Sequence, residues 1–320
     1  MAEETLFWLN IRADGCYVDC TLGGAGHAAA IAQQLGPKGQ LIGIDQDADA
    51  LKAAAERLDK LASLASISLV EANFAELDVI LSNRKIAAAD GILADLGVSS
   101  WQLDQPERGF AYLQDGPLDM RMNQSSSLTA AELVNTWPQD RLADILFDYG
   151  EERYAGRISR AIVARRSQRP FNSTTDLAEL VITAMPAASR REAQHPARRT
   201  FQALRIAVND ELKVLEQLLK IAPPLLQDGG RLCVITFHSL EDRLVKQAFQ
   251  TLEKPCICPR DFPVCTCGRK PMGRVLTRRP IIATEEEKSA NPRSRSAHLR
   301  CFERIVATDV NNKERSHVLH

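Results

Sequence analysis

The residues that point most directly to chemistry form a short strand, a glycine-rich turn and an acid. The strand is Tyr17-Val18-Asp19, and the turn that follows is Gly23-Gly24-Ala25-Gly26-His27. About 20 residues further on, Leu41-Ile42-Gly43-Ile44-Asp45 predicts a second strand that ends in a carboxylate. Glycines let the backbone approach a ligand closely, and an acid at this place accepts hydrogen bonds from ribose hydroxyls. The pattern therefore predicts a site for a ligand that contains a nucleoside.

The glycine turn by itself is compatible with two such ligands, NAD and S-adenosylmethionine. Gly24-x-Gly26-x-x-Ala29 fits the dinucleotide pattern, and the same turn suits S-adenosylmethionine, which carries no phosphate. Asp19 lies just before the glycines, where a carboxylate attracts the ammonium of a methionine moiety and repels a pyrophosphate. S-adenosylmethionine is therefore favoured. NAD, or a βα turn with no ligand, remains the alternative on this segment.

Two further candidate residues follow the next predicted strands. Ser66–Glu71 predicts a third strand with Phe74 just beyond it, and 90–95 predicts a fourth, which ends in Asp95. The carboxyl ends of parallel strands meet at one edge of a sheet, so these residues are expected near the glycine turn. There Asp45 would bind the ribose, Phe74 would pack on the adenine, and Asp95 would lie beside the methyl group.

The elements that position these residues alternate between strands and helices as far as residue 103, which predicts an α/β fold with a parallel sheet. Residues 104–200 show helical periodicity without strands, and predict an inserted all-helical domain. A long helix over 201–219 and a strand over 229–237 return to the sheet. His238 is then expected at the same edge as Asp95, or as the cap of the next helix.

The expected organisation has four parts. They are a first part of the core at 1–103, the inserted helices at 104–200, a second part of the core at 201–306 that contains a Cys- and Arg-rich segment at 253–300, and a disordered tail at 307–320.

Charge is divided unevenly along the chain. Residues 1–130 carry 9 basic and 18 acidic side chains, whereas residues 131–320 carry 31 and 23. Every basic residue between 151 and 205 is an arginine, and a second arginine-rich stretch lies between 260 and 304. Arginine makes paired hydrogen bonds to phosphate and stacks on bases. Either stretch alone would suit a solvated helix face; together they favour a nucleic-acid partner.

Composition is that of an ordinary globular protein, with 45% hydrophobic and 25% charged residues. No apolar run reaches the roughly 18 residues that a membrane helix needs. The first ten residues lack the basic start and apolar stretch of a signal peptide. We expect a cytoplasmic protein with no membrane partner, and we infer no protein partner.

The eight cysteines fall into two groups. Four of them suit small core positions: Cys16, Cys20, Cys233 and Cys301. The other four form a C-x-C…C-x-C pair: Cys256, Cys258, Cys265 and Cys267. Four thiolates can close a tetrahedral zinc site, but this spacing is tighter than the usual one. Zinc binding therefore stays open, no metal ligand is assigned, and disulfides are not expected in the cytosol.

Longer motifs resemble a known family. The run GILADLGVSSWQL at 91–103 is very similar to a signature of the bacterial small-subunit rRNA (cytosine-N4)-methyltransferase H family. Further similar blocks, which keep their order along the chain, lie at 107–110, 115–122, 149–153, 200–205, 237–243 and 291–297. The resemblance covers roughly residues 4–304.

The resemblance implies a class I, Rossmann-like methyltransferase sheet with an inserted all-helical domain. It implies S-adenosylmethionine as donor, and as acceptor the N4 amino group of a cytidine in the decoding region of 16S rRNA, in free rRNA or the small ribosomal subunit. By motif position it implies donor contacts from Ala25, Gly26, His27, Asp45, Phe74, Asp95 and Gln102.

We assign Asp95 as the catalytic residue. A hydrogen-bond acceptor near N4 would localise the nitrogen lone pair as the new bond forms. A backbone carbonyl of Leu96 or Gly97 is the alternative acceptor.

The sequence departs from the family at two places. Ala25 stands where many members have glycine, a change that the turn should tolerate if φ stays negative. The family's N-terminal His-x-Pro-Val segment is absent, which puts the cover of the donor pocket in question.

Two rival functions remain. A cytosine-C5 methyltransferase needs a cysteine nucleophile, for which Pro255-Cys256 is the candidate dipeptide, but that nucleophile is expected where this chain has Asp95. A non-catalytic, zinc-containing RNA-binding protein would leave Asp45 and the glycine turn without a role.

Overall fold

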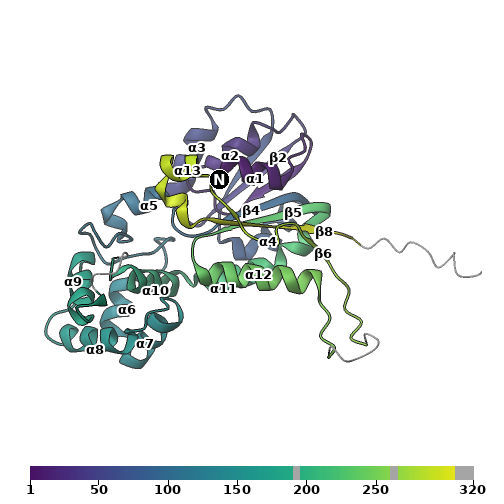
Figure 1. Ribbon diagram of the computed structural model, residues 1–320. Coiled ribbons are helices and arrows are strands. Elements are labelled where there is room, and N and C mark those ends of the chain that lie inside the picture. The colour runs from purple at the N-terminus through teal and green to yellow at the C-terminus, as the bar shows by residue number, and fades with distance from the viewer. Residues whose placement is uncertain (190–194, 260–265, 307–320) are drawn as a thin grey trace, which may run out of the picture.

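The computed structural model of the chain describes residues 1–189, 195–259 and 266–306. Its centre is a single sheet with the strand order β3-β2-β1-β4-β5-β8-β6, and β7 also pairs with β8 (Figure 1). The strands from β3 to β5 are parallel neighbours, whereas β8 runs antiparallel to β5. The predicted Rossmann-like α/β fold with inserted helices is confirmed.

The strand bounds are β1 Cys16–Asp19, β2 Gln40–Asp45, β3 Ser66–Glu71, β4 Ala89–Asp95, β5 Leu226–Thr236, β6 Gly273–Val275, β7 Ile281–Ile282 and β8 His298–Arg304. The helix bounds are α1 Ala2–Leu9, α2 Gly26–Ala32, α3 Ala48–Leu58, α4 Leu77–Asn83, α5 Ser100–Asp104, α6 Ala130–Thr136, α7 Gln139–Asp148, α8 Ala155–Arg166, α9 Thr174–Ala184, α10 Arg198–Asn209, α11 Glu211–Ile221, α12 Ser239–Glu253 and α13 Glu285–Ala290.

Helices cover both faces of the sheet, with α1, α2 and α3 above it in Figure 1 and α11 and α12 below. Successive strand residues point to opposite faces. Tyr17 is therefore buried against the first group of helices and Val18 against the second, and Leu93 and Ile92 divide in the same way. Burial on both sides explains why these strands are continuous apolar runs.

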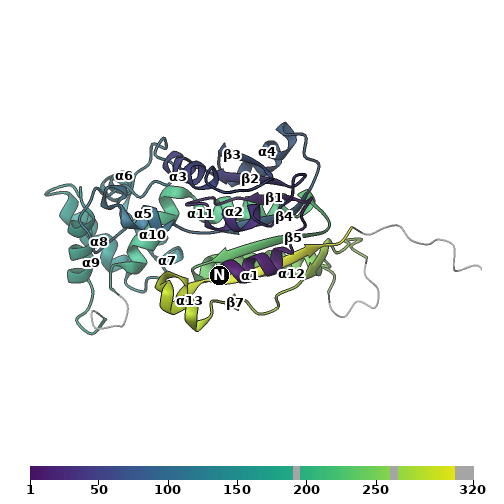
Figure 2. The same cartoon turned by 90° about the horizontal axis from the view of Figure 1, so that it is seen from above.

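The inserted helices form a core of their own. Helices α6 to α10 gather at one end of the sheet in both Figure 1 and Figure 2. Their shared core includes Leu133, Leu142, Ile158 and Leu177, each with less than 1% of its surface exposed. This unit therefore folds around its own apolar centre beside the sheet.

The continuous helix that we predicted over 201–219 is wrong, because the chain breaks at Asp210. This residue adopts a left-handed conformation with φ of 49° between α10 and α11. Before the break, Phe201 and Leu204 pack into the core of the inserted helices. After it, Leu215 packs against the sheet. The break lies where the chain passes from one core to the other.

The beginning and the end of the insertion are tied together by one side chain. The amide oxygen of Asn209 accepts a hydrogen bond from the backbone N–H of Met122 at 2.8 Å. Its amide nitrogen donates to the carbonyl of Met120, also at 2.8 Å. Asn209 therefore fixes the end of α10 against the loop that enters the insertion.

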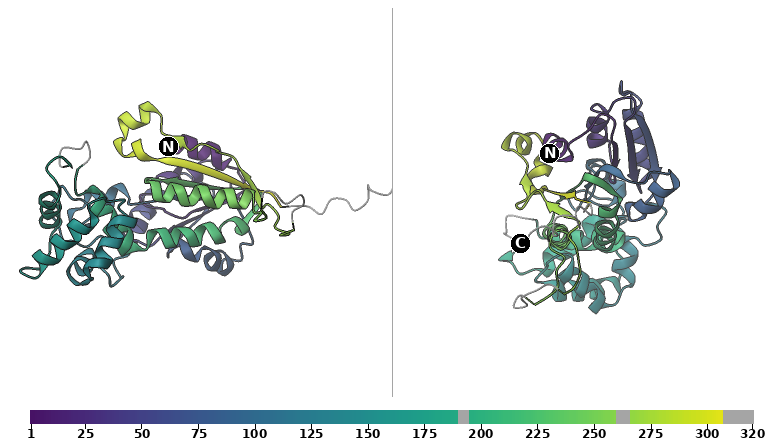
Figure 3. Two further views of the ribbon diagram at one scale, coloured as in Figure 1. Left: turned by 60° about the horizontal axis from the view of Figure 1, so that its bottom comes forward. Right: turned by 90° about the vertical axis from the view of Figure 1, so that its right-hand side faces the viewer.

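Helix α1 was not predicted from the sequence. Helix α12 begins directly after His238, and Glu241 accepts the backbone N–H groups of Phe237 and His238. The segment 253–300 contains β6, β7 and α13, and Figure 3 shows α13 beside the N-terminal helix. The tail that we expected to be disordered lies outside the described residues. Within the described part of the chain, every helix is too short or too polar to cross a membrane.

Candidate functional site

A cavity of about 1240 Å³ opens at the carboxyl ends of β1, β2 and β4. One wall contains the glycine turn and the strand ends, a second comes from α10 and the β5–α12 connection, and a third from residues 291–297. The structure brings six of the seven predicted donor-binding residues to this cavity: Gly26, His27, Asp45, Phe74, Asp95 and Gln102. Ala25 is buried behind the turn and does not line it.

Asp45 holds the glycine turn onto the end of β2. Its carboxylate accepts hydrogen bonds from the backbone N–H of Gly23 at 2.8 Å and from that of Asp47 at 2.9 Å. Burial raises the pKa of Asp45, although these backbone donors oppose the shift. Because a carboxylate offers about four lone-pair positions, Asp45 keeps capacity for ribose hydroxyls.

The backbone at Ala25 contradicts our expectation of a negative φ. Ala25 adopts a left-handed conformation with φ of 55°, and its N–H donates to the carbonyl of Leu22 at 2.7 Å. This conformation turns the chain sharply into α2. For a residue with a Cβ it costs about 1–2 kcal/mol, which explains why glycine suits this place better.

Asp95 is an acid with a strongly shifted pKa at the cavity. Burial, followed by the charge of Asp19, raises the pKa of Asp95 to about 7. The cavity still leaves 32% of its side chain accessible. Its Oδ1 has no hydrogen-bond partner among the described residues, although the atom is buried. This carboxyl can therefore accept a bond from a group in the cavity.

His27 faces Asp95 without forming an ion pair at neutral pH. The distance from His27 Nε2 to Asp95 Oδ2 is 3.6 Å, too long for a hydrogen bond. Burial lowers the pKa of His27 to about 4, so the ring is neutral. Its buried Nδ1 also lacks a partner within the described part of the chain. The imidazole therefore contributes a polar surface rather than a charge.

These features fit S-adenosylmethionine. Its ammonium and sulfonium are both cationic, and Asp19 and Asp95 both line the cavity. Burial raises the pKa of Asp19 to about 7 as well. A cation beside these carboxyls would restore their ionised forms, whereas a pyrophosphate would be repelled. Phe74, half-buried after β3, offers an apolar surface to an adenine.

Gln102 lines the cavity, but both ends of its amide are bonded within the protein. Its Oε1 accepts from the N–H of Ser99 at 3.0 Å, and its Nε2 donates to Asp47 at 2.7 Å. Arg108 also donates to Asp47, at 2.8 Å. These two hydrogen bonds show that Gln102 fixes the loop after β4. The buried pair of Asp47 and Arg108 was missed from sequence, although both residues adjoin motifs that we had recognised.

The opposite wall carries His238 and Glu241. His238 is the N-cap residue of α12 and also lines the cavity, so both of our expectations for it hold in the structure. Its Nε2 lies 3.2 Å from Glu241 Oε1. Burial raises the pKa of Glu241, but the bonds from His238 and the backbone of Phe237 outweigh it and leave this pKa below its usual value. Exposed Arg198 and Arg295, one from each of the two arginine-rich stretches, also lie on this side.

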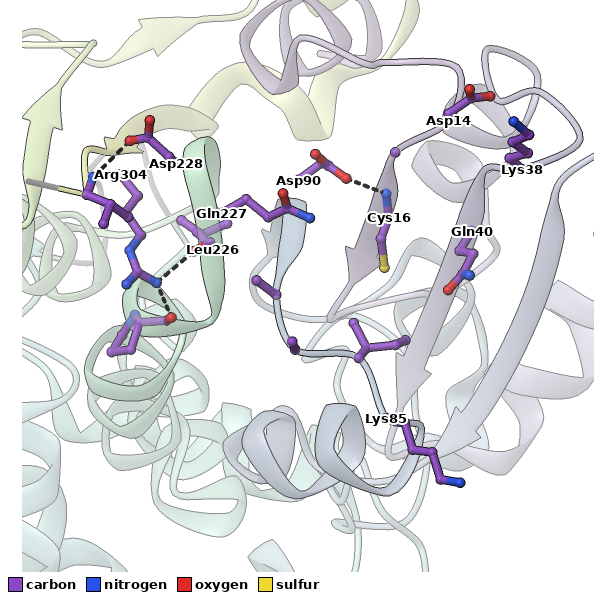
Figure 4. Close-up of a pocket in the computed structure, with 16 residues that line it drawn as sticks. Asp14, Cys16, Lys38, Gln40, Lys85, Asp90, Leu226, Gln227, Asp228 and Arg304 are labelled. Atoms are coloured by element: carbon purple, nitrogen blue, oxygen red, sulfur yellow. Dashed lines mark hydrogen bonds between the residues drawn. The ribbon is translucent and has the colours of Figure 1, made fainter. Parts of the chain in front are cut away.

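A second hollow, of about 750 Å³, lies at the other end of the sheet (Figure 4). Two of the charged side chains that line it, Asp90 and Arg304, are bonded to the protein itself. Asp90 accepts from the backbone N–H of Cys16 at 2.7 Å. Arg304 donates to the carbonyls of Pro224 and, at 2.6 Å, of Leu226. No predicted site residue lies in this hollow.

Comparison with known proteins agrees with the cavity at the carboxyl ends. A family model described as the MraW methylase family matches residues 1–305. The chain is 52% identical to "Ribosomal RNA small subunit methyltransferase H" of Symbiobacterium thermophilum, over 96% of both chains. Proteins with this name from Carboxydothermus hydrogenoformans and Clostridium botulinum are 50% identical over 95% of this chain, and 96% and 97% of their own lengths are covered.

The match includes every residue that lines the cavity, from the donor-side turn to the segment 291–297. The predicted cofactor, S-adenosylmethionine, is confirmed by this match to a family of methylases. Because the family model matches residues 1–305 and a relative shares half of its residues over nearly the whole length, the chain belongs to the MraW methylase family.

Proposed function

We propose that this methylase acts on small-subunit ribosomal RNA, and that it transfers the methyl group to the exocyclic N4 of a cytidine in the decoding region. The names of the relatives support the substrate class. The observation that carries the choice of N4 is the carboxyl of Asp95, which lies in the cavity with a raised pKa and an oxygen that has no partner among the described residues. Transfer to an amino group needs such an acceptor.

Cytosine N4 is a poor nucleophile because its lone pair is delocalised into the ring. S-adenosylmethionine supplies a methyl group on a positively charged sulfur. Asp95 accepts a hydrogen bond from the N4 amino group and so localises the lone pair for in-line attack. As the N–C bond forms and the C–S bond breaks, one N4 proton moves to the Asp95 carboxylate and later to solvent. A pKa of about 7 suits both steps.

The loop after β4 offers a second acceptor. Gly97 has φ of 91°, a conformation that turns the chain directly after Asp95. The carbonyl of Leu96 or Gly97 could accept a hydrogen bond from one N4 hydrogen while Asp95 accepts a hydrogen bond from the other. The capping bonds of Ser99 and Gln102 fix this loop from its far end.

The wall opposite the donor turn suits the RNA. Phe201 and Phe237 line it and offer apolar surfaces to a base taken out of its stack. Exposed Arg198 and Arg295 lie at the same cavity, where they can contact phosphates. We propose that the core formed by 1–103 and 201–306 binds the donor, and that the insertion at 104–200 helps to bind the RNA.

The arginine-rich stretches contribute fewer RNA contacts than their composition suggests. Arg165 pairs with Asp176. In the same way, other arginines of these stretches bond within the protein: Arg205 to Glu211 at 2.8 Å and Arg300 to Asp242 at 2.7 Å. Exposed Arg157 and Arg160 on α8 are the better candidates on the inserted helices.

Methylation at C5 would need a cysteine thiolate at the base. Cys256 is not among the residues that line the cavity. Cys20 lines it, but burial raises the pKa of this thiol well above its usual range. A covalent adduct with RNA that contains 5-fluorocytidine would contradict the direct transfer proposed here.

The decisive test incubates the protein with methyl-labelled S-adenosylmethionine and either 16S rRNA or assembled small subunits. Digestion to nucleosides and mass spectrometry then identify the product. We expect N4-methylcytidine at one position in at least one substrate, and far less of it in the same time with the Asp95→Asn variant. A label on C5, on a ribose or on another base would refute the proposed acceptor while leaving methylase activity intact.

A further inference from the structure

Three cysteine thiols lie together far from the cavity. Cys256, Cys258 and Cys267 belong to the segment between α12 and β6, which extends away from the sheet at the end opposite the inserted helices (Figure 1). Their sulfur atoms all lie within 4.8 Å of one another. None of the three lines the donor cavity. The cluster is therefore separate from the methylation site.

The other described cysteines show that this cluster is not a packing feature. Cys20, Cys233 and Cys301 are buried, with 1% or less of their surfaces exposed, and pack as small apolar residues. Half-buried Cys16 behaves similarly, since burial raises the pKa of its thiol to about 11. Cys256, by contrast, is exposed, and its two neighbours are only half-buried. Burial of apolar surface cannot account for three thiols at such a place.

The backbone beside the cluster is arranged to stabilise a thiolate. The N–H of Thr266 donates to the sulfur of Cys258 at 3.4 Å, and the Thr266 hydroxyl lies 3.7 Å from the same sulfur. Hydrogen bonds of this kind orient metal-bound sulfur ligands and tune their basicity. Thr266 directly precedes Cys267, so this stretch of backbone supplies one ligand, Cys267, and the hydrogen-bond donor to another, Cys258.

We propose that Cys256, Cys258 and Cys267 bind a zinc ion that fixes the segment between α12 and β6. Tetrahedral zinc with Zn–S bonds of about 2.3 Å requires sulfur atoms about 3.8 Å apart, so a shift of about 1 Å completes the arrangement. Sulfur-rich tetrahedral sites favour zinc or iron–sulfur clusters, and three thiolates around a single small space favour zinc. A fourth ligand completes the coordination. Cys265 is in the same segment of the sequence but lies outside the described residues.

The position of the site makes it structural. It holds no residue of the donor cavity, and the described residues around it, 254–259 and 266–272, are exposed or half-buried. Exposed Arg269 and Lys270 lie two and three residues after Cys267. A fixed loop would present these two cations in one place instead of many, which links the metal to binding of a polyanion without any part in the chemistry.

The test measures metal in the full-length protein. Protein purified without chelators from cells supplied with zinc is analysed by elemental mass spectrometry, and we expect one zinc per chain. The triple variant Cys256→Ser, Cys258→Ser, Cys267→Ser should lose at least nine-tenths of it. Cys16→Ala removes a thiol elsewhere and should keep the full content. S-adenosylmethionine binding by all three proteins verifies that they are folded.

A second measurement uses cobalt(II) on the metal-free wild-type protein and needs no variant. Thiolate coordination should give intense sulfur-to-metal charge-transfer absorption and the visible bands of a tetrahedral site. Limited proteolysis within 254–272 should also become slower when zinc is added. Zinc bound equally by the triple variant, no thiolate absorption with cobalt, or a wild-type mass lower by two hydrogens from a disulfide would each overturn the proposal.

Discussion

The two ends of the sheet are both hollowed and both lined by charged side chains, but they use those charges differently. At the amino end, Asp90 and Arg304 bond to backbone groups of the protein. At the carboxyl end, Asp95 and His27 each keep a buried polar atom with no partner among the described residues. Hollow volume and charge alone therefore do not mark a functional site. Unused bonding capacity together with a shifted pKa does.

One strand contains both situations. Asp90 lies near the beginning of β4 and Asp95 at its end, so the same strand carries an acid that bonds to the backbone and the acid that we propose as the proton acceptor. Substitutions at these two positions give matched experiments on one strand. The predictions below begin with the effect that we expect to be largest.

Asp95→Asn should lower the rate of methyl transfer by roughly 10²–10⁴-fold, because the proton acceptor is lost. Single-turnover kinetics with saturating RNA and donor measure this step. Asp90→Asn is the matched control and should keep the wild-type rate. Near-normal transfer by Asp95→Asn would move the role to the carbonyls of Leu96 and Gly97.

Asp45→Ala should weaken S-adenosylmethionine binding by about 1–3 kcal/mol, because hydrogen bonds to the ribose are lost. Calorimetric titration measures the affinity. Glu71→Ala is the control, since Glu71 pairs in register with Asp45 on β3, is exposed and does not line the cavity. Equal affinities for the two variants would show that Asp45 does not bind the donor.

Asp90→Asn should lower the free energy of unfolding by about 1–3 kcal/mol, because a charged acceptor for the Cys16 N–H is lost. Urea denaturation measures the change. Asp95→Asn should act in the opposite direction at pH 8. The folded protein holds the pKa of Asp95 above that of an unfolded chain, so ionisation there opposes folding as the pH rises from about 4 to about 7. A loss of stability in both variants would contradict this contrast.

The kcat/KM for the donor, which reports the donor-free protein, should rise about tenfold per pH unit below pH 7 and level off above it, because the ionised carboxylate accepts the proton. The apparent pKa belongs jointly to Asp95 and Asp19, whose pKa burial also raises to about 7. Initial rates from pH 5.5 to 8.5 test this expectation. The residual activity of Asp95→Asn should lose most of this slope, and an unchanged slope would assign it to another group.

Ala25→Gly has the smallest expected effect, a gain of up to about 1 kcal/mol in the free energy of unfolding. Glycine removes the strain of φ at 55°, while its larger unfolded-state entropy offsets part of the gain. Thermal unfolding without donor measures it. Ala28→Gly, within α2, is the control and should destabilise, since its position is helical. A loss of stability in both variants would show that the turn is not strained.

The sheet was predictable because its strands are buried on both faces and therefore apolar throughout. The predicted strand over Ser66–Glu71 matches β3, and the acid predicted at the end of the fourth strand, Asp95, ends β4. The break at Asp210 could not be predicted, since the apolar periodicity continues through it. It arises because the two halves of the segment pack into two separate cores.

For the site, the sequence shows which residues gather at the sheet edge but not how their polar atoms are used. Gln102 reaches the cavity, yet its amide is bonded to Ser99 and Asp47. Arg165 and Arg205 contributed to a predicted RNA surface, and each pairs with an acid of the protein. Such pairings depend on residues brought together only by tertiary packing, which composition and spacing do not encode.

The bonds of Asn209 to Met120 and Met122 affect the conformational entropy of the chain. They make residues 123–208 a closed loop, whose two ends meet at the side chain of Asn209. The entropy of closing such a loop grows only with the logarithm of its length, by about 0.6 kcal/mol for each doubling. A change in the length of the insertion should therefore alter the free energy of closing this loop only slightly, and so have little effect on the sheet.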